Sequence, residues 1–380
     1  MSLRKKIEHN IRHFRSYILP SHRRSAVNAR KAASPIPQDK PLCVIDFKSI
    51  KIDNVTGRYL YHLVTEFETM GYAIAYTDRF RFLATMEIKA CKKLLLSHKF
   101  SIVPLREIPS NCEILLTDTA ESHTDLATKV ISVVYDQVRP PVDSKNTFSL
   151  PFFVHPEIHE SGQVERSLAN SDTSQSRPMS LLFAGNAKAP KYDAPVLPDK
   201  YKVLSRVKAL AVAENALGPN LVRRPLLLDQ LVPPPEQRAS LTIATTQDLR
   251  IPSEQWIETL ALGDFYFACP GVEMPLCHNL IESLAAGSIP ILQYPQYLTP
   301  SLTDGIDCLV YSCESSLVAV LQKVLNMPED EIQIMRLAAQ DYYRKHLQPG
   351  CFAKQLIASD SQRSTVYLNA YRVPIEVPPH

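Results

Sequence analysis

The stretch 265–292 reads FYFACPGVEMPLCHNLIESLAAGSIPIL. It opens with an apolar run at 265–268 that predicts a buried strand, and it closes with a second such run, Ile289–Leu292. A loop with proline and glycine follows the first run, and the pattern of residues 278–286 predicts a helix. Because a helix that joins two buried strands is the building unit of parallel sheets, the stretch predicts a Rossmann-like α/β domain.

The same alternation of strand and helix patterns extends along the chain in two series. The first begins with the apolar run at 42–47, followed by a helix pattern at 57–70 and a strand pattern at 72–76. The second begins at 180–185 and includes the stretch quoted above. A chain of 380 residues exceeds what one hydrophobic core usually serves, so the sequence predicts two Rossmann-like domains that face each other across a cleft.

Changes in composition along the chain predict five parts. They are a basic amphipathic leader with a linker at 1–40, an N-terminal Rossmann-like domain at 41–160, an interdomain linker at 161–179, a C-terminal Rossmann-like domain at 180–350 and a tail at 351–380. Polar residues mark the interdomain linker, and the tail is expected to cross back onto the first domain.

Charge is distributed unevenly along the chain. The chain has 42 basic and 39 acidic residues, and residues 1–32 contain nine of the basic and one of the acidic residues. The remainder therefore has 33 basic and 38 acidic residues, a net charge of −5. Apolar residues recur in this leader at helical spacing, at Leu3, Ile7, Ile11, Phe14 and Ile18. This pattern is typical of a helix on an anionic membrane surface, and the alternative is a solvated extension that packs one stripe on the protein. With no nucleic-acid-binding motif in the chain, we expect no nucleic acid partner.

The sequence also excludes several classes of protein. No run approaches the roughly 18 apolar residues of a membrane-spanning helix, and the N-terminus lacks the apolar block of a signal peptide. We therefore expect a cytoplasmic protein that is peripheral at the inner membrane face through its leader. Eight cysteines without metal-ligand spacing, and the lack of an Asp-x-Asp motif, predict that the protein uses neither a metal nor a cofactor.

The loop and helix start within 265–292 are suited to a nucleotide. In open parallel sheets, ligands bind beyond the carboxyl ends of the strands, where helix N-termini present free N–H groups. Gly271 lies in the loop, and the helix begins near His278 and Asn279, whose backbone amides would hold a diphosphate. Glu282, one turn later, would accept hydrogen bonds from a ribose diol, and the alternative is an ordinary capping or surface carboxylate.

The segments Asn279–Glu282 and 284–291 (LAAGSIPI) resemble the C-terminal donor-binding motif of exostosin-like and related GT-B glycosyltransferases. The resemblance extends over about 252–311. It implies a nucleotide-sugar donor in the C-terminal domain and an acceptor, either a glycan or a lipid-linked one, in the N-terminal domain. It also places Glu273 near the donor sugar. Glu273 and Glu282 stand one residue further apart than the paired glutamates of many retaining enzymes, so the stereochemical course stays open.

Cations are needed to neutralise the diphosphate leaving group when no metal is present. The loop after the strand pattern at 180–185 provides the best candidates, Gly185, Asn186, Lys188 and Lys191. The alternative for each lysine is a solvated loop position.

Further candidates lie outside the C-terminal motif. The acceptor-binding candidates follow the first strand pattern and are Asn54, Thr56, Gly57 and Arg58. The candidates for the general base are Asp118, Asp136 and His155. Either aspartate would equally suit a helix cap, and His155 a hinge stacked on Pro156.

The sequence therefore predicts a metal-independent glycosyltransferase that moves a sugar from a nucleotide sugar to a glycan or lipid-linked acceptor. Two alternatives remain open: a non-catalytic binding or scaffold protein with the same fold, and another nucleotide-sugar enzyme.

Overall fold

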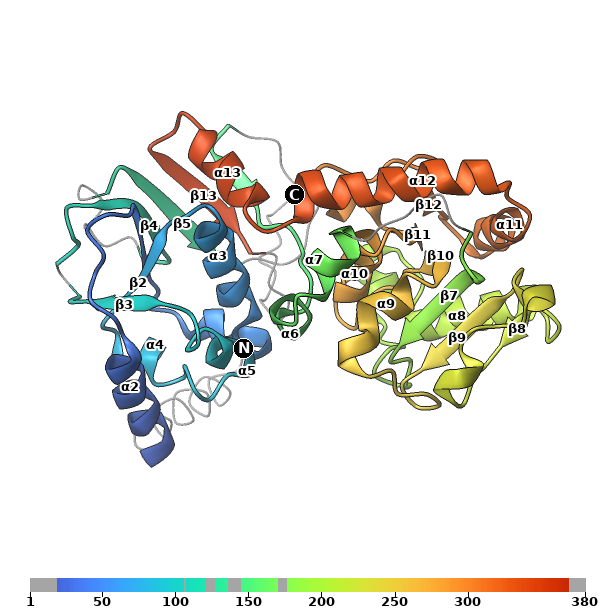
Figure 1. Cartoon of the computed structure of the whole chain (residues 1–380), viewed down its shortest axis with the longest axis horizontal. Helices are drawn as coiled ribbons and strands as arrows, with labels where there is room; N and C mark the ends of the chain where they lie inside the picture. The colour runs from blue at the N-terminus through green and yellow to red at the C-terminus, as the bar shows by residue number, and fades with distance from the viewer. Residues whose placement is uncertain (1–18, 106, 120–126, 136–144, 170–175, 369–380) are drawn as a thin grey trace. The chain divides into compact units, whose positions relative to one another are not determined.

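The structure is a computed structural model of the chain, and it describes residues 19–105, 107–119, 127–135, 145–169 and 176–368. The described residues form two compact units. Unit 1 contains 19–135, 145–150 and 349–368, and unit 2 contains 151–348. Both are α/β units built on a parallel sheet, as Figure 1 shows, so the predicted fold class of two Rossmann-like domains is confirmed. That they face each other across a cleft stays a prediction.

The sheet of unit 1 has seven strands, and every neighbouring pair is parallel. Its order is β3-β2-β1-β4-β5-β13-β6. The bounds are β1 Leu42–Asp46, β2 Ala73–Thr77, β3 Phe100–Val103, β4 Cys112–Thr117, β5 Lys129–Val134, β6 Thr147–Ser149 and β13 Arg363–Tyr367. All five residues of β1 are buried, which explains its continuous apolar pattern.

The helices of unit 1 connect these strands. They are α2 Pro20–Ala32, α3 Arg58–Thr69, α4 Phe80–Leu83, α5 Ala90–Leu94 and α13 Cys351–Ala358, with a 3₁₀ stretch at Ile50–Gly57. Helix α3 buries Leu60, Leu63, Val64 and Phe67, which recur at helical spacing on its core face. After α3, Gly71 takes a positive φ of 84°, which ends the helix before β2.

Helix α2, the second half of the predicted leader, belongs to unit 1. Ala26 and Ala29 are fully buried, and the Ser25 hydroxyl donates to the Leu83 carbonyl at 3.0 Å. Residues 20–32 therefore pack one stripe of side chains on unit 1. Residues 1–18, which carry the predicted membrane-facing stripe, lie outside the described part of the chain.

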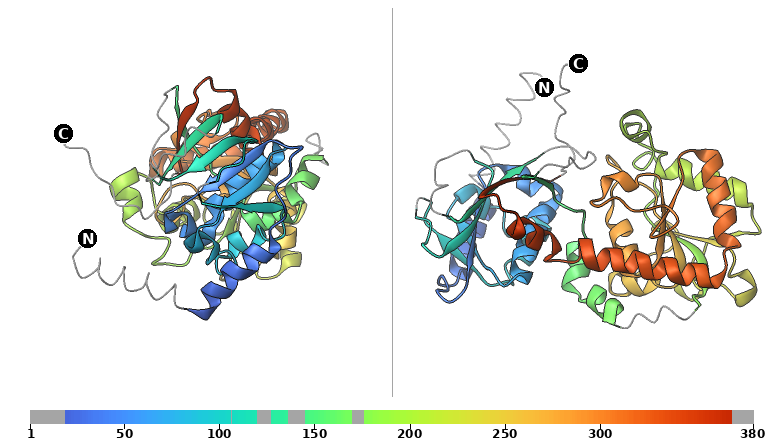
Figure 2. Two further views of the ribbon diagram at one scale, coloured as in Figure 1. Left: turned by 90° about the vertical axis from the view of Figure 1, so that its left-hand side faces the viewer. Right: turned by 90° about the horizontal axis from the view of Figure 1, so that it is seen from above.

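The sheet of unit 2 has six strands in the order β12-β11-β10-β7-β9-β8, again with every neighbouring pair parallel. The strands are β7 Met179–Gly185, β8 Val222–Arg223, β9 Leu241–Thr245, β10 Gly263–Phe267, β11 Ile289–Leu292 and β12 Leu309–Val310. The helices are α6 Pro156–Glu160, α7 Gln163–Ala169, α8 Arg206–Leu217, α9 Trp256–Leu260, α10 His278–Ala285, α11 Glu314–Leu325 and α12 Glu329–Tyr342. Figure 2 shows α12, the long orange helix, running along one side of this unit.

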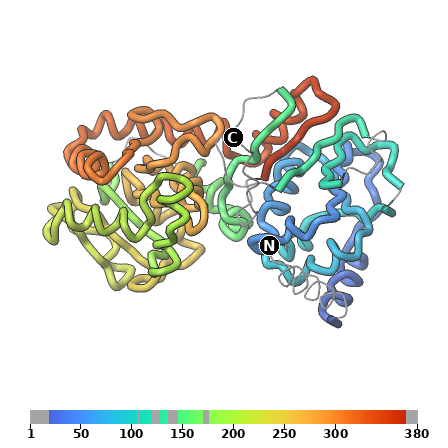
Figure 3. Tube along the Cα trace, turned by 180° about the vertical axis from the view of Figure 1, so that it is seen from behind, coloured from blue at the N-terminus to red at the C-terminus, as the bar shows by residue number. Residues whose placement is uncertain are grey.

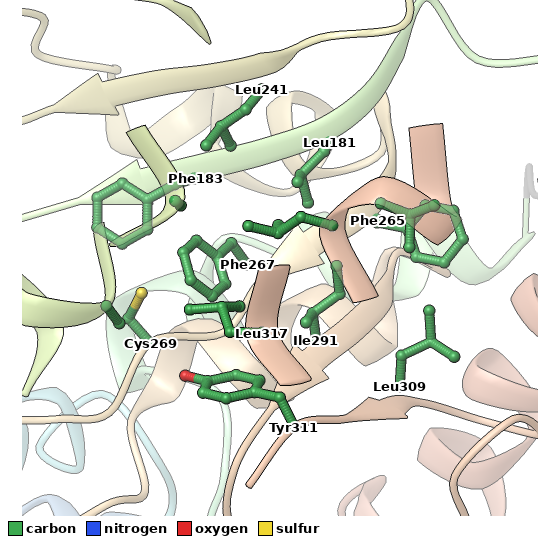
Figure 4. Close-up of a cluster of buried hydrophobic side chains, with 14 of the residues drawn as sticks. Leu181, Phe183, Leu241, Phe265, Phe267, Cys269, Ile291, Leu309, Tyr311 and Leu317 are labelled. Carbon is green, nitrogen blue, oxygen red and sulfur yellow. The ribbon is translucent and has the colours of Figure 1, made fainter. Parts of the chain in front are cut away.

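Figure 4 shows the core of unit 2, in which aromatic side chains of neighbouring strands pack against aliphatic ones. Phe183 of β7 and Phe265 and Phe267 of β10 are at most 1% exposed. Burying each such side chain contributes about 1.5–3 kcal/mol, so these three fix the strand pair around which the site is built.

A network of buried charges stabilises the amino end of β10. Asp264 is fully buried, and its carboxylate accepts a hydrogen bond from Arg238 at 2.7 Å. Arg177 donates to the carbonyls of Gly263 and Ala286, each at 2.8 Å. Burial raises the pKa of Asp264 to about 6.

The C-terminal segment returns to unit 1, where β13 lies between β5 and β6. Figure 3 shows this red segment among the strands of that unit. Helix α13 is held at both ends by side chains of unit 1. At its N-terminus, Glu66 accepts hydrogen bonds from Gly350, Phe352 and Ala353 at 2.9–3.1 Å. At its C-terminus, Lys129 donates to the carbonyls of Leu356 and Ile357 at 2.7 and 3.1 Å. Each charge has the sign that the helix dipole favours.

The domain boundaries differ from the predicted linker. Residues 163–169, predicted to be part of a linker, form α7 within unit 2, and the chain enters that unit at Pro151. The side-chain Nε2 of Gln163 donates to the Ser253 carbonyl at 2.9 Å, which binds α7 to the segment before α9.

Candidate functional site

The candidate site lies at the carboxyl edge of the sheet of unit 2, between β7 and β10. After β7 the chain forms β8 and β9 on one side of that strand, where β9 pairs with β7, whereas β10 pairs with β7 on the other side. Ligands of open α/β sheets bind where the strand order reverses in this way, because the two connecting segments diverge there. The loop after β7 and the loop between β10 and α10 meet at this point.

The loop after β7 begins with Gly185, whose φ is 144°. A Cβ atom at this position would lie 3.0 Å from Nδ2 of Asn279 and 3.7 Å from Nη1 of Arg206. Glycine is therefore needed for the close approach of these two side chains. Asn279 donates from Nδ2 to the Ala184 carbonyl at 3.0 Å and to the Tyr266 hydroxyl at 2.9 Å, so it fastens α10 to the end of β7.

Arg206, at the start of α8, joins the two loops of the site. Its guanidinium is buried and donates to the Asn186 carbonyl at 2.7 Å and to the Pro270 carbonyl at 3.0 Å. The ring of Tyr192 lies 4.3 Å from the guanidinium carbon, a cation–π contact. Arg206 thus sets the spacing of the loops, a role that the sequence did not reveal because its partners are backbone atoms of distant segments.

The two predicted phosphate-binding lysines, Lys188 and Lys191, are exposed in the loop after β7. The loop is ordered by Asn186, whose Oδ1 accepts from the Lys188 amide at 2.9 Å and from Nε2 of Gln247 at 3.0 Å. Gln247 follows β9 and also accepts from the Ala187 amide at 3.3 Å. Sequence reasoning missed Gln247, since only the pairing of β9 with β7 brings it to this edge.

The loop between β10 and α10 is a tight turn. The Gly271 amide donates to the Pro275 carbonyl at 3.0 Å, and a Cβ atom on Gly271 would lie 2.7 Å from the Met274 carbonyl oxygen. Glu273 is half-buried in this turn. Within the described chain, the N-cap residue of α10, Cys277, makes no side-chain capping hydrogen bond.

Glu282 lies in α10, but it is 2% exposed and both carboxylate oxygens accept hydrogen bonds from the protein. Oε1 accepts from the His155 amide at 2.9 Å and Oε2 from Nε1 of Trp256 at 2.6 Å. Burial raises its pKa to about 7, although both hydrogen bonds act in the opposite direction. This geometry differs from the predicted ribose contact, because a ribose would have to displace one of these donors.

His278 and His155 both lie at the junction of α10 with the segment that enters unit 2. His278 donates from Nδ1 to the Phe153 carbonyl at 2.6 Å, and the two imidazole rings are 5.1 Å apart, edge to face. His155 caps α6, since its Nδ1 accepts from the Glu157 amide at 3.4 Å. Both roles predicted for His155, a general base and a hinge stacked on Pro156, stay predictions.

In unit 1, Asp118 lies where the strand order reverses, between β1 and β4. Its carboxylate accepts from the amides of Lys48 and Ser49 at 2.7 and 2.9 Å and from the Tyr135 hydroxyl at 3.0 Å. Burial raises its pKa above the usual value. Asp118 therefore holds the N–H groups of the loop after β1, and its role as a general base stays a prediction. Asp136 lies outside the described residues.

The acceptor candidates surround the start of α3. Asn54 and Thr56 lie in the 3₁₀ stretch, Gly57 is the N-cap with a φ of 82°, and Arg58 is the first helical residue. A Cβ atom on Gly57 would lie 2.5 Å from Cγ of Lys92, so glycine serves packing here. These four residues belong to unit 1, whereas the donor candidates belong to unit 2.

Two further expectations concern metals and membranes. Among the described residues, no group of three or more His, Cys, Asp or Glu side chains could hold a metal ion. In the same part of the chain, every helix is too short or too polar to cross a bilayer.

No protein-family model and no curated protein matches the sequence. The fold is similar to several solved structures at low identity. HepE from Anabaena in complex with UDP shares 10% identity over 83% of this chain and 98% of that one, with a TM-score of 0.42. A glycosyltransferase from Rickettsia africae shares 9% over 84% and 97%, with a TM-score of 0.44. UGT89C1 from Arabidopsis thaliana, complexed with quercetin, shares 11% over 84% and 99%, with a TM-score of 0.38. At these values the likeness assigns no function to this chain.

Proposed function

We propose that this protein is a GT-B-type glycosyltransferase that binds a nucleotide sugar at the carboxyl edge of the sheet of unit 2. One observation carries the proposal. The loop after β7, which begins with Gly185 and contains two exposed lysines, meets the start of α10 at the point where the strand order reverses between β7 and β10. The resemblance of 265–292 to the donor-binding motif of exostosin-like enzymes supports the same assignment.

The site has the parts that a diphosphate needs. The N-terminus of α10 offers backbone N–H groups and the positive end of a helix dipole. Lys188 and Lys191 supply two positive charges to neutralise the diphosphate as it leaves, so no metal is required. Glu273, in the turn between β10 and α10, is the candidate for the contact with the donor sugar.

The acceptor would be a glycan or a lipid-linked sugar bound by Asn54, Thr56, Gly57 and Arg58 of unit 1. Attachment to the inner membrane face would then depend on the basic leader, residues 1–32. A second candidate, a nucleotide-sugar-binding protein without transferase activity, is favoured by one observation. The carboxylates of Asp118 and Glu282, both predicted to act on ligands, are engaged in hydrogen bonds that hold loops together.

The test is calorimetric titration with UDP, GDP, CMP and ADP, followed by the K188A/K191A double variant. We expect one nucleotide to bind, and we expect the double variant to lose about tenfold or more in affinity, because two charge-assisted contacts are removed. The matched control is K323A, which removes an exposed lysine from the last turn of α11. Equal affinities of the double variant and the control, or no binding by the wild type, would contradict the proposal. Binding without sugar release from the matching nucleotide sugar would support the non-catalytic candidate.

A further inference from the structure

The segment by which the chain enters unit 2 is fastened to α10. At this segment, 151–155, the His155 amide donates to Oε1 of Glu282 at 2.9 Å. The other carboxylate oxygen accepts from the indole of Trp256, at the start of α9, at 2.6 Å. One buried carboxylate thus ties the entry segment and α9 to the same turn of α10.

A second contact lies one helical turn earlier on the same face of α10, since residues four apart are neighbours on a helix. His278 bonds through Nδ1 to the Phe153 carbonyl at 2.6 Å, and because a carbonyl only accepts, Nδ1 carries the proton. The imidazole also packs on the rings of Phe152 and Phe153, with centroids 4.9 and 5.5 Å away.

These contacts form one unit because the carboxylate is 2% exposed. A buried carboxylate is costly unless its oxygens are hydrogen-bonded, so separating the entry segment from α10 would leave Glu282 with an unpaired oxygen. The first turn of α10 and residues 152–155 therefore keep one relative position as long as both hydrogen bonds hold.

We infer that Glu282 is a positioning residue that couples nucleotide binding at the start of α10 to the segment 152–155, through which the chain enters unit 2. The inference rests on the proposed function, since the same helix start is the proposed phosphate site. A ligand that draws the first turn of α10 towards itself displaces His278 and Glu282, and with them the entry segment. Binding in unit 2 thus acts on the connection to unit 1.

The chain contains a single tryptophan, which is the partner of Glu282. Its fluorescence therefore reports this contact without any label. Amide hydrogen exchange at His155 reports the other half of the contact, because that N–H is bonded to Oε1. Neither signal would respond to a nucleotide if Glu282 served only to stabilise the unit.

The experiment titrates UDP, GDP, CMP and ADP into the full-length wild type and E282Q, with tryptophan emission, His155 amide exchange and calorimetric Kd as readouts. Glutamine keeps one accepting oxygen but places an amide nitrogen where the second donor points, so one of the two hydrogen bonds is lost. We expect nucleotide to change both signals in the wild type. In E282Q we expect Kd to be at least about fivefold weaker and the exchange response at His155 to be lost.

The matched control is D264N, which weakens a buried carboxylate network at the opposite end of the same sheet. The coupling is supported if D264N loses about as much thermal stability as E282Q but binds the nucleotide with the same Kd as the wild type. Equal weakening in both variants, or an unchanged Kd in E282Q, overturns it while leaving the proposed function intact. Failure of the wild type to bind any of the four nucleotides overturns both.

If E282Q does not fold, the wild type alone carries the test. Nucleotide binding that leaves both the tryptophan emission and the exchange of the His155 amide unchanged overturns the coupling.

Discussion

Replacing Glu66 should destabilise unit 1 more at acid pH than at alkaline pH. Glu66 is 1% exposed, and its Oε2 accepts three backbone N–H groups at the start of α13. In E66A these three donors lose their acceptor. Each donor that stays buried and unpaired costs about 1–3 kcal/mol. With partial relaxation of the helix start, the total cost in free energy of unfolding is about 4 kcal/mol.

The pH dependence follows from the pKa of Glu66, which burial raises from 4.5 to about 7. A carboxyl group whose folded pKa is raised contributes stability that is fully present below its unfolded pKa and is lost as pH rises through its folded pKa. The shift of about 2.5 units corresponds to about 3 kcal/mol. At about pH 8 the wild type has already lost this contribution, so the cost of E66A falls from about 4 to about 1 kcal/mol.

The assay is urea unfolding at about pH 5 and about pH 8, with alkylation of Cys43 and Cys112 measured by mass spectrometry. Both thiols are buried in the sheet of unit 1, whereas Trp256 fluorescence follows unit 2 in the same samples. The isosteric E66Q keeps a neutral accepting oxygen and should show a smaller loss with little pH dependence. A larger loss for E66A at alkaline pH would refute the reasoning, because the ionised carboxylate would then be the stabilising form.

Two further predictions test other local features. Hydrogen bonds from Ser315 and Ser316 lower the pKa of the exposed Cys313 thiol to about 6. At neutral pH, iodoacetamide should therefore label Cys313 faster than the other seven cysteines. C313S should remove the fast phase, and labelling of Cys313 at the rate of an ordinary thiol would contradict this prediction. G57A and G71A compare two glycines with φ near 80°, of which only Gly57 would bring its Cβ against Lys92. Urea unfolding should show that the free energy of unfolding falls by about 3 kcal/mol in G57A and by about 1 kcal/mol in G71A. Equal losses would show that the Lys92 side chain moves aside without cost.

The sequence was sufficient to predict the local elements around the site. The expected strand at 265–268, helix near 278–286 and strand at 289–292 correspond to β10, α10 and β11 within two residues at each end. Each of these is encoded by a contiguous apolar run or by helical spacing, which depends only on nearby residues.

Contacts between distant residues could not be predicted in this way. Glu282 was expected to face a ribose because of its place in the helix, yet its partners Trp256 and His155 are 26 and 127 residues away in sequence. Asp118 likewise bonds to the amides of Lys48 and Ser49, about 70 residues earlier. A carboxylate near a strand end can accept hydrogen bonds from a substrate or from the backbone of a loop, and the tertiary structure determines which of the two it contacts.

The place of β13 in the sheet of unit 1 has a consequence for how the protein is made. Because β13 lies between β5 and β6, β6 has its strand partner only after residues 363–367 have left the ribosome. The whole of unit 2, residues 151–348, emerges before that moment and is free to fold first. The nascent first unit meanwhile exposes the open edge of β5, a surface on which other chains can pair and which chaperones commonly protect. Synthesis therefore reverses the usual order, and the domain translated first is completed last.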